Sequence, residues 1–129
     1  MKMYLISTGI FLCIDAIWLG FIARGIYAKY LGYIMAKNIV WWAAGVFYLI
    51  FMAGLLFFVI EPSVRTQSIR YALAAGAFFG FVAYATYDLT NLATIEGWPL
   101  FVTVIDLIWG AFVASSTSVL SYMLINRFM

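Results

Sequence analysis

Residues 39–60, IVWWAAGVFYLIFMAGLLFFVI, contain no charged side chain and are almost entirely apolar. A helix needs about 20 apolar residues to cross a bilayer core that is about 30 Å thick. Backbone N–H and C=O groups cannot remain unpaired in lipid, so a segment of this kind must be helical. The stretch therefore predicts a transmembrane helix.

The rest of the chain agrees with a membrane location. Of its 129 residues, 67% are hydrophobic and only 9% are charged, whereas soluble domains carry about 25% charged residues. The length fits one transmembrane domain, residues 1–129, with the lipid bilayer as its surroundings. The net charge of +2 is too small and too scattered to indicate a nucleic-acid partner.

Three further segments are long and apolar enough to cross the bilayer: 3–23, 70–90 and 100–122. Glu61-Pro62-Ser63 is expected to end the second span, because proline has no N–H and disfavours helix in the residue before it. Gly97-Trp98-Pro99 precedes the fourth span. No alternating pattern of barrel strands is present. The sequence predicts an all-α, integral membrane four-helix bundle.

The linker between the first two spans has a helical pattern of its own. Between residues 25 and 37, one face of such a helix is apolar and the other holds Lys29 and Lys37. This pattern predicts a short amphipathic helix lying in the membrane surface. Its apolar face would contain Ile26, Tyr27, Tyr30, Leu31, Ile34 and Met35.

Four spans place both termini on one side of the membrane. Basic residues are only slightly more frequent there than on the other side, which favours cytoplasmic termini weakly and leaves insertion in both orientations open. The terminal side holds Lys2, Arg65, Arg70 and Arg127, and the other side holds Arg24, Lys29 and Lys37.

The sequence offers few of the residues that usually bind metals or cofactors. The chain has no histidine, and Cys13 is its one cysteine. A disulfide within the chain and a Cys/His metal site are therefore excluded. We expect no metal and no cofactor.

Three aspartates, Asp15, Asp88 and Asp106, lie in or at the end of predicted spans. An aspartate at the centre of a transmembrane helix costs about 3 kcal/mol on insertion scales, so such residues usually face the bundle interior or a cavity. The alternating directions of the spans place all three in the half of the membrane near the 91–99 loop. We expect them to face one another.

Each aspartate shares a helical face with small, hydroxyl or aromatic residues. Plain helix packing explains the small residues of these rows, and Gly76 with Gly80 forms a GxxxG pair that permits close approach. The rows are Tyr4, Thr8, Phe11, Asp15 and Trp18; Ala72, Gly76, Gly80, Tyr84 and Asp88; and Asp106, Gly110, Ala114, Thr117 and Ser121. Asp15-Ala-Ile-Trp18 also resembles Asp106-Leu-Ile-Trp109, but short matches are expected by chance in so biased a composition.

The stretch YATYDLTN, residues 84–91, places Asp88, Thr90 and Asn91 within one helical turn. If the third span ends near Asn91, Asp88 lies in its last turn, where the helix dipole disfavours an anion. We expect Asp88 to pair with Arg24 or a lysine of the amphipathic helix, or to share a proton with Asp106. The candidate ligand- or proton-binding residues are Asp15, Tyr84, Asp88, Thr90, Asn91 and Asp106. The alternative is that the three aspartates hold the bundle together through hydrogen bonds.

Four motifs resemble a family of small bacterial inner-membrane proteins catalogued as domain of unknown function 2177. They are DAIWLG at 15–20, FYLIFMAG at 47–54, YATYDLTNLAT at 84–94 and WPLFVTVIDLIWG at 98–110. The resemblance covers nearly the whole chain and implies a multi-pass protein of the bacterial inner membrane. It implies no activity, substrate or catalytic residue.

Three functions fit these features. The first is transport of a small solute, an ion or protons through a carboxylate-lined bundle, working as a homodimer. The second is an accessory subunit that assembles with a partner membrane protein. The third is a membrane-embedded enzyme that modifies lipid, since paired carboxylates can perform acid–base chemistry. The absence of histidine and of a nucleophile motif makes the enzyme the least favoured of the three, and transport is preferred.

Overall fold

The computed structural model describes residues 2–32 and 41–128, without the side chains of residues 22–24. These residues form helices joined by short turns, and no strand occurs among them. Four helical segments are long and apolar enough to cross a membrane: Lys2–Phe21, Trp41–Thr66, Ile69–Thr94 and Leu100–Phe128. The predicted all-α bundle of four spans is confirmed.

The first two spans each contain a π-helical segment, and the last two are regular α-helices. In chain order the elements are α1 Lys2–Ile17, η1 Trp18–Ile22, α2 Ala23–Leu31, α3 Trp41–Leu55, η2 Leu56–Ile60, α4 Glu61–Thr66, α5 Ile69–Thr94 and α6 Leu100–Phe128.

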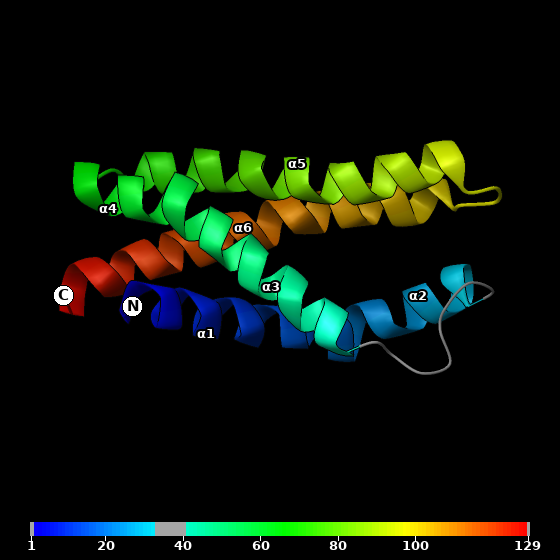
Figure 1. The fold of residues 1–129 in the computed structure, drawn as a ribbon, viewed down its shortest axis with the longest axis horizontal. Coiled ribbons are helices and arrows are strands. Elements are labelled where there is room, and N and C mark those ends of the chain that lie inside the picture. The colour runs from blue at the N-terminus through cyan, green and yellow to red at the C-terminus, as the bar shows by residue number, and fades with distance from the viewer. Residues whose placement is uncertain (1, 33–40, 129) are drawn as a thin grey trace.

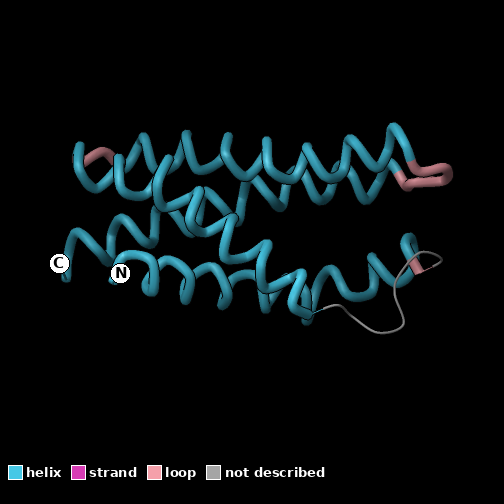
Figure 2. Tube along the Cα trace, in the orientation of Figure 1, coloured by secondary structure: helices cyan, strands magenta, loops and turns pink. Residues whose placement is uncertain are grey.

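Helix α6 is the centre of the bundle. It packs against α5 more extensively than against any other element, and it also contacts α1, α2, η2 and α4. Figure 1 shows α3 crossing the bundle obliquely, with both termini at one end and the α5–α6 turn at the other. Figure 2 shows that the two described connections between spans, after α4 and between α5 and α6, are short compared with the helices. The common end of the two termini agrees with the four predicted crossings.

The short helix after the first span is present, but it is not separate from that span. The helical backbone runs from Lys2 through η1 into α2 without a break, and α2 continues in the direction of α1 (Figure 1). Its apolar face packs with Trp98 and Val102 beside the α5–α6 turn. Residues 33–37 of the predicted helix, including Lys37, lie outside the described part of the chain. A position in the membrane surface stays a prediction.

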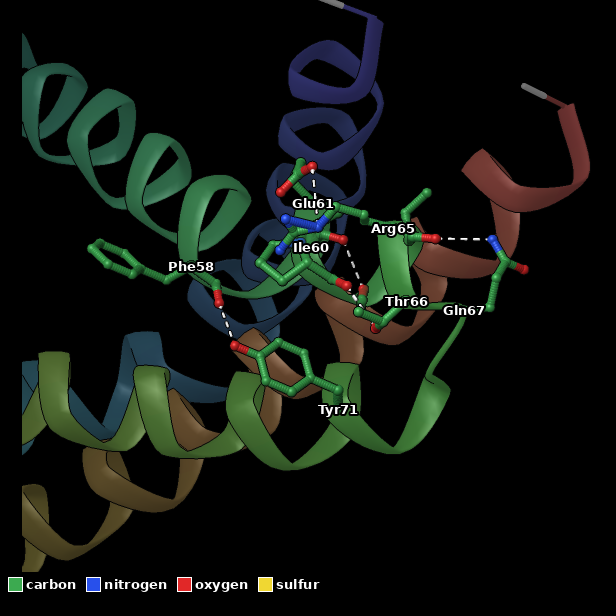
Figure 3. Close-up of polar contacts among 10 residues, drawn as sticks. Phe58, Ile60, Glu61, Arg65, Thr66, Gln67 and Tyr71 are labelled. Carbon is green, nitrogen blue, oxygen red and sulfur yellow. Dashed lines mark hydrogen bonds and ion pairs between the residues drawn. The ribbon is translucent and has the colours of Figure 1, made fainter.

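Pro62 does not end the second span, so this prediction was wrong. The helix continues from η2 through α4 to Thr66, with the proline in its first turn. A proline at this position deprives the Phe58 carbonyl of its usual N–H donor. The Tyr71 hydroxyl donates to that carbonyl instead, at 2.8 Å, as Figure 3 shows. The turn follows at Gln67, which has a positive φ of 56°.

The third span also extends beyond its predicted end. Helix α5 continues to Thr94, and the Ile95 N–H bonds the Asn91 carbonyl at 2.8 Å beyond it. The Thr94 hydroxyl donates to the Thr90 carbonyl at 2.7 Å. Asp88 therefore lies more than a turn inside α5 rather than in its last turn. The helix dipole, which weakens rapidly away from the terminus, is not what determines its surroundings.

The outer surface of the bundle is apolar. Large hydrophobic side chains are exposed on every span, including Trp41 at 73% and Trp42 at 75%. In water such a surface would cause aggregation, whereas in a bilayer it is covered by acyl chains. The buried residues of α6 include many small and hydroxyl side chains, as expected where transmembrane helices approach closely.

Candidate functional site: a cavity lined by three carboxyl groups

A partly open cavity of about 450 Å³ lies between α1, α2, α3, α5 and α6. All three intramembrane aspartates line it, and half of its lining residues are aromatic. The lining consists of Asp15, Trp18, Leu19, Tyr27, Leu31, Ala44, Phe47, Tyr48, Ala83, Tyr84, Tyr87, Asp88, Asp106 and Trp109. The three predicted rows thus meet at this cavity through Asp15, Trp18, Tyr84, Asp88 and Asp106, and their other members do not line it.

Close packing of α5 on α6 brings Asp88 and Asp106 together. A Cβ atom added at Gly80 would overlap the Gly110 carbonyl oxygen, and one added at Gly110 would lie 2.5 Å from the Tyr84 ring. At Gly76 it would lie 3.0 Å from the Ala114 carbonyl oxygen. The two backbones can approach this closely only because glycine has no side chain. The glycines predicted as packing residues therefore also determine the geometry of the carboxyl pair.

Asp15 of α1 is bound by a tyrosine of the second span. The Tyr48 hydroxyl donates to its Oδ2 at 2.7 Å, and only 6% of Asp15 is exposed. Phe11, one turn earlier on the same face, packs edge-on against Tyr48 with ring centroids 5.6 Å apart. Trp109 of α6 also interacts with this carboxyl, although its N–H makes no hydrogen bond of ordinary geometry among the described residues.

Asp106 of α6 is bound by a tyrosine of α2. The Tyr27 hydroxyl donates to its Oδ1 at 2.5 Å and accepts from the Trp18 indole N–H at 3.3 Å. Tyr27 lies beyond the end of the first span, and burial and then the bond to Asp106 raise the pKa of its phenol. The phenol therefore stays a proton donor. This chain of hydrogen bonds ties α2 to the start of α6.

Asp88 of α5 has no such donor. The residue is fully buried, and neither carboxyl oxygen has a hydrogen-bond donor among the described residues. Asp106 is close enough for a hydrogen bond between the two carboxyl groups when one of them is protonated. Two adjacent buried carboxylates are not tolerated without a cation or a proton. Among the described residues, Asp88 is therefore the carboxyl of the cavity that no hydroxyl group binds.

The expected ion pair of Asp88 does not occur among the described residues. Among the described residues the one ion pair is the exposed Arg65–Glu61 contact of α4, drawn in Figure 3. Lys29 is exposed and lies 5.3 Å from the centroid of the Tyr30 ring. The side chain of Arg24 and all of Lys37 lie outside the described residues. The alternative expectation, a proton shared with Asp106, fits the geometry.

Trp18 and Trp109 both line the cavity and pack against each other. Their rings stack with centroids 4.5 Å apart and planes 9° apart. Each is the fourth residue of a D-x-x-W motif, so the two similar motifs meet across the antiparallel pair α1 and α6. The stack uses one face of each indole.

The remaining predicted residues divide into two groups. Tyr84 lines the cavity, whereas Thr90 and Asn91 do not, and Thr90 is exposed. The side chains that sequence reasoning missed as site residues are Tyr27 and Tyr48. Tyr27 lies on the predicted apolar face of its helix, but α3 is apolar on all sides, so periodicity gave no sign that Tyr48 points inward.

The chemistry available in the cavity is that of carboxyl and phenol groups. None of the lining residues that the structure describes is basic. Among the described residues, no group of three or more histidine, cysteine, aspartate or glutamate side chains is placed to hold a metal ion. The arrangement can bind a positively charged group or exchange protons.

The fold and this cavity define the class of protein: an integral membrane bundle of four spanning helices with acidic groups in its interior. Residues 1–123 match the family described as predicted membrane protein (DUF2177), and the chain belongs to that family. No curated protein is similar enough to count as a match. The same holds for solved structures.

Proposed function

We propose that this protein transports a small cation or a proton-coupled solute across the membrane, with the carboxyl-lined cavity as its binding site. One observation supports this above all: Asp88 is fully buried and has no donor among the described residues, yet it lines a partly open cavity. Burying an ionisable group in a membrane interior costs free energy, and groups buried there are usually functional.

The three carboxyl groups have different roles in this proposal. Asp15 and Asp106 are already bound by Tyr48 and Tyr27, so they contribute charge and position. Asp88 binds the cation or the proton directly, and Asp106 beside it shares that charge. Release of a proton from the pair prepares the site for a cation, and binding of a proton expels it.

The surroundings proposed with this function are the bacterial cytoplasmic membrane, with both termini in the cytoplasm and two copies of the chain acting together. The slight excess of basic residues on the terminal side supports that orientation. A role as an accessory subunit would instead require a partner protein that covers the exposed apolar faces. Lipid covers those faces equally well, so they do not favour this alternative.

Flux through reconstituted protein tests the proposal. Purified protein is placed in liposomes that contain a pH-sensitive dye, and a membrane potential is imposed with potassium and valinomycin. We expect proton movement, alone or together with an added cation, that exceeds that of empty liposomes. Asp88→Asn should reduce it to the level of empty liposomes, and Glu96→Gln should not.

Glu96→Gln is the control because it removes one carboxylate, as Asp88→Asn does. Glu96 is exposed in the α5–α6 turn and does not line the cavity. A thermal transition shows whether the reconstituted protein is folded. If folded wild-type protein gives no more flux than empty liposomes, the proposal is contradicted.

A further inference from the structure

The lining of the cavity indicates what kind of cation it accepts. Apart from the three carboxyls, the cavity presents aromatic and aliphatic side chains. The faces of tyrosine and tryptophan rings attract cations within about 6 Å of the ring centroid. Aromatic walls combined with a buried acid are suited to a cation whose charge is carried by an organic group.

An inorganic ion fits the same cavity poorly. Hard cations require several oxygen ligands at once, six or more for Ca²⁺. Asp15 and Asp106 each already accept a tyrosine hydroxyl, and no metal-binding group is present among the described residues. An organic cation needs only one opposing charge and contact with apolar surface, which Asp88 and the aromatic rings supply.

The mouth of the cavity is apolar as well. Its most exposed lining residues are Leu19 at 44%, Phe47 at 46% and Tyr87 at 59%, whereas Asp88 at the interior is fully buried. These three side chains belong to the first, second and third spans, whose outer faces are covered by lipid. A ligand that passes them needs an apolar body as well as a charge.

We infer that the cavity binds an organic ammonium cation with an apolar body, the charge at Asp88 and the body against the aromatic walls. The inference rests on the proposed transport function and specifies its substrate class. A volume of about 450 Å³ lies within the range of about 300–1,000 Å³ that is usual for small-molecule sites.

Calorimetric titration of the purified protein in detergent tests this directly. The probe is benzyltrimethylammonium, which has a quaternary charge and an aromatic body. Two comparison ligands separate its features: neopentylbenzene, in which carbon replaces the nitrogen and the charge is lost, and tetramethylammonium, which lacks the ring. We expect saturable binding of the probe, at least about tenfold weaker binding of tetramethylammonium and no saturable binding of neopentylbenzene.

Variants locate the site. Asp88→Asn should weaken binding of the probe at least about tenfold, Asp88→Glu should restore most of it, and Glu96→Gln should leave it unchanged. The comparison of the three ligands on the wild-type protein remains decisive even if a variant fails to fold.

Other outcomes overturn the inference. Equal binding of the probe and neopentylbenzene would show that charge is not recognised, and equal binding of the probe and tetramethylammonium would show that the apolar body is not. If flux in liposomes depends on Asp88 while the probe does not bind, the substrate class is wrong and the proposed transport stands. If both flux and binding are absent, both proposals are wrong.

Discussion

Gly80 of α5 and Gly110 of α6 lie backbone against backbone. A Cβ atom at Gly80 would overlap the Gly110 carbonyl oxygen and would lie 2.6 Å from the Ala114 Cβ atom. Both obstacles belong to the helix backbone or to a side chain that cannot rotate away. The contact holds α5 and α6 together and places Asp88 beside Asp106.

Gly80→Ala should therefore destabilise the protein strongly. Forcing an extra methyl group into a close-packed interior costs about 1–3 kcal/mol, and separation of α5 from α6 would add to this. Gly45→Ala is the matched control, because nothing lies within 4 Å of a Cβ atom there. That change should be neutral or stabilise the helix by up to about 1 kcal/mol. Unfolding in detergent measures the stability of both variants. If Gly80→Ala and Gly45→Ala change the free energy of unfolding equally, α5 and α6 do not approach each other as closely as described.

Tyr27→Phe should loosen the attachment of α2 to α6. The substitution removes the hydroxyl that donates to Asp106 and accepts from Trp18, while the ring remains. Hydrogen bonds between transmembrane helices contribute about 0.6 kcal/mol on average and up to about 1.7 kcal/mol. Because a carboxyl is involved, we expect a loss near the upper value. Tyr30→Phe, which keeps the ring contact with Phe101, is the control.

Hydrogen exchange adds a local measurement to this prediction. Amides of α2 should exchange faster in Tyr27→Phe than in wild type, and those of α5 should not, because only the link between α2 and α6 is removed. Unchanged exchange in α2 would mean that other contacts, such as those in the cluster of Leu31, Trp98 and Val102, suffice to hold this helix.

The carboxyl groups should respond differently to replacement by asparagine. Asp88→Asn should raise the thermal midpoint, because the amide can donate to Asp106 without the proton that two adjacent buried carboxyl groups must take up. A buried hydrogen bond contributes about 1 kcal/mol. Asp15→Asn should lower the midpoint by a similar free energy, because the Tyr48 hydroxyl then binds a neutral amide instead of a carboxylate.

Both variants are compared with wild type in one detergent at one pH. If Asp88→Asn destabilises the protein as much as Asp15→Asn does, the three aspartates hold the bundle together, and the proposed binding role of Asp88 loses its main support.

The helices could be predicted because membrane spans leave a strong local signal. Long apolar runs identify them without any knowledge of tertiary contacts. The errors occurred at the helix ends. Pro62 looked like a terminator, but the free Phe58 carbonyl finds the Tyr71 hydroxyl from the next helix. Such compensation depends on a distant residue and cannot be inferred from the local pattern.

The three aspartates of the candidate site could be predicted from the sequence, but the side chains that bind them could not. The cost of a carboxylate in lipid singled out Asp15, Asp88 and Asp106 wherever they pointed. Tyr48 gave no comparable signal, because tyrosine is common in membrane helices and α3 has no polar face to orient it. The stack of Trp18 on Trp109 likewise depends on how two helices meet, which short similar motifs do not determine.

The tryptophans offer a test of which surface faces lipid. Trp42 in α3 is 75% exposed, whereas Trp98 beside the α5–α6 turn is 6% exposed and donates its indole N–H to Thr103 at 3.0 Å. Trp42 lies in the first turn of α3 and Trp98 just before α6, at the ends of these spans opposite the termini. Phospholipids brominated near the headgroup quench tryptophan fluorescence on contact. In variants that retain one tryptophan, with phenylalanine at the other positions, Trp42 should be quenched several-fold more than Trp98.

The comparison also tests whether α3 is an interface between protein chains. A homodimer or a partner protein seated on α3 would shield Trp42 and reduce its quenching to the level of Trp98. Trp41, 73% exposed and one residue away, points in another direction and serves as the internal control. Strong quenching of both would show that lipid covers the start of α3 on more than one face, so any second copy of the chain must bind elsewhere on the bundle.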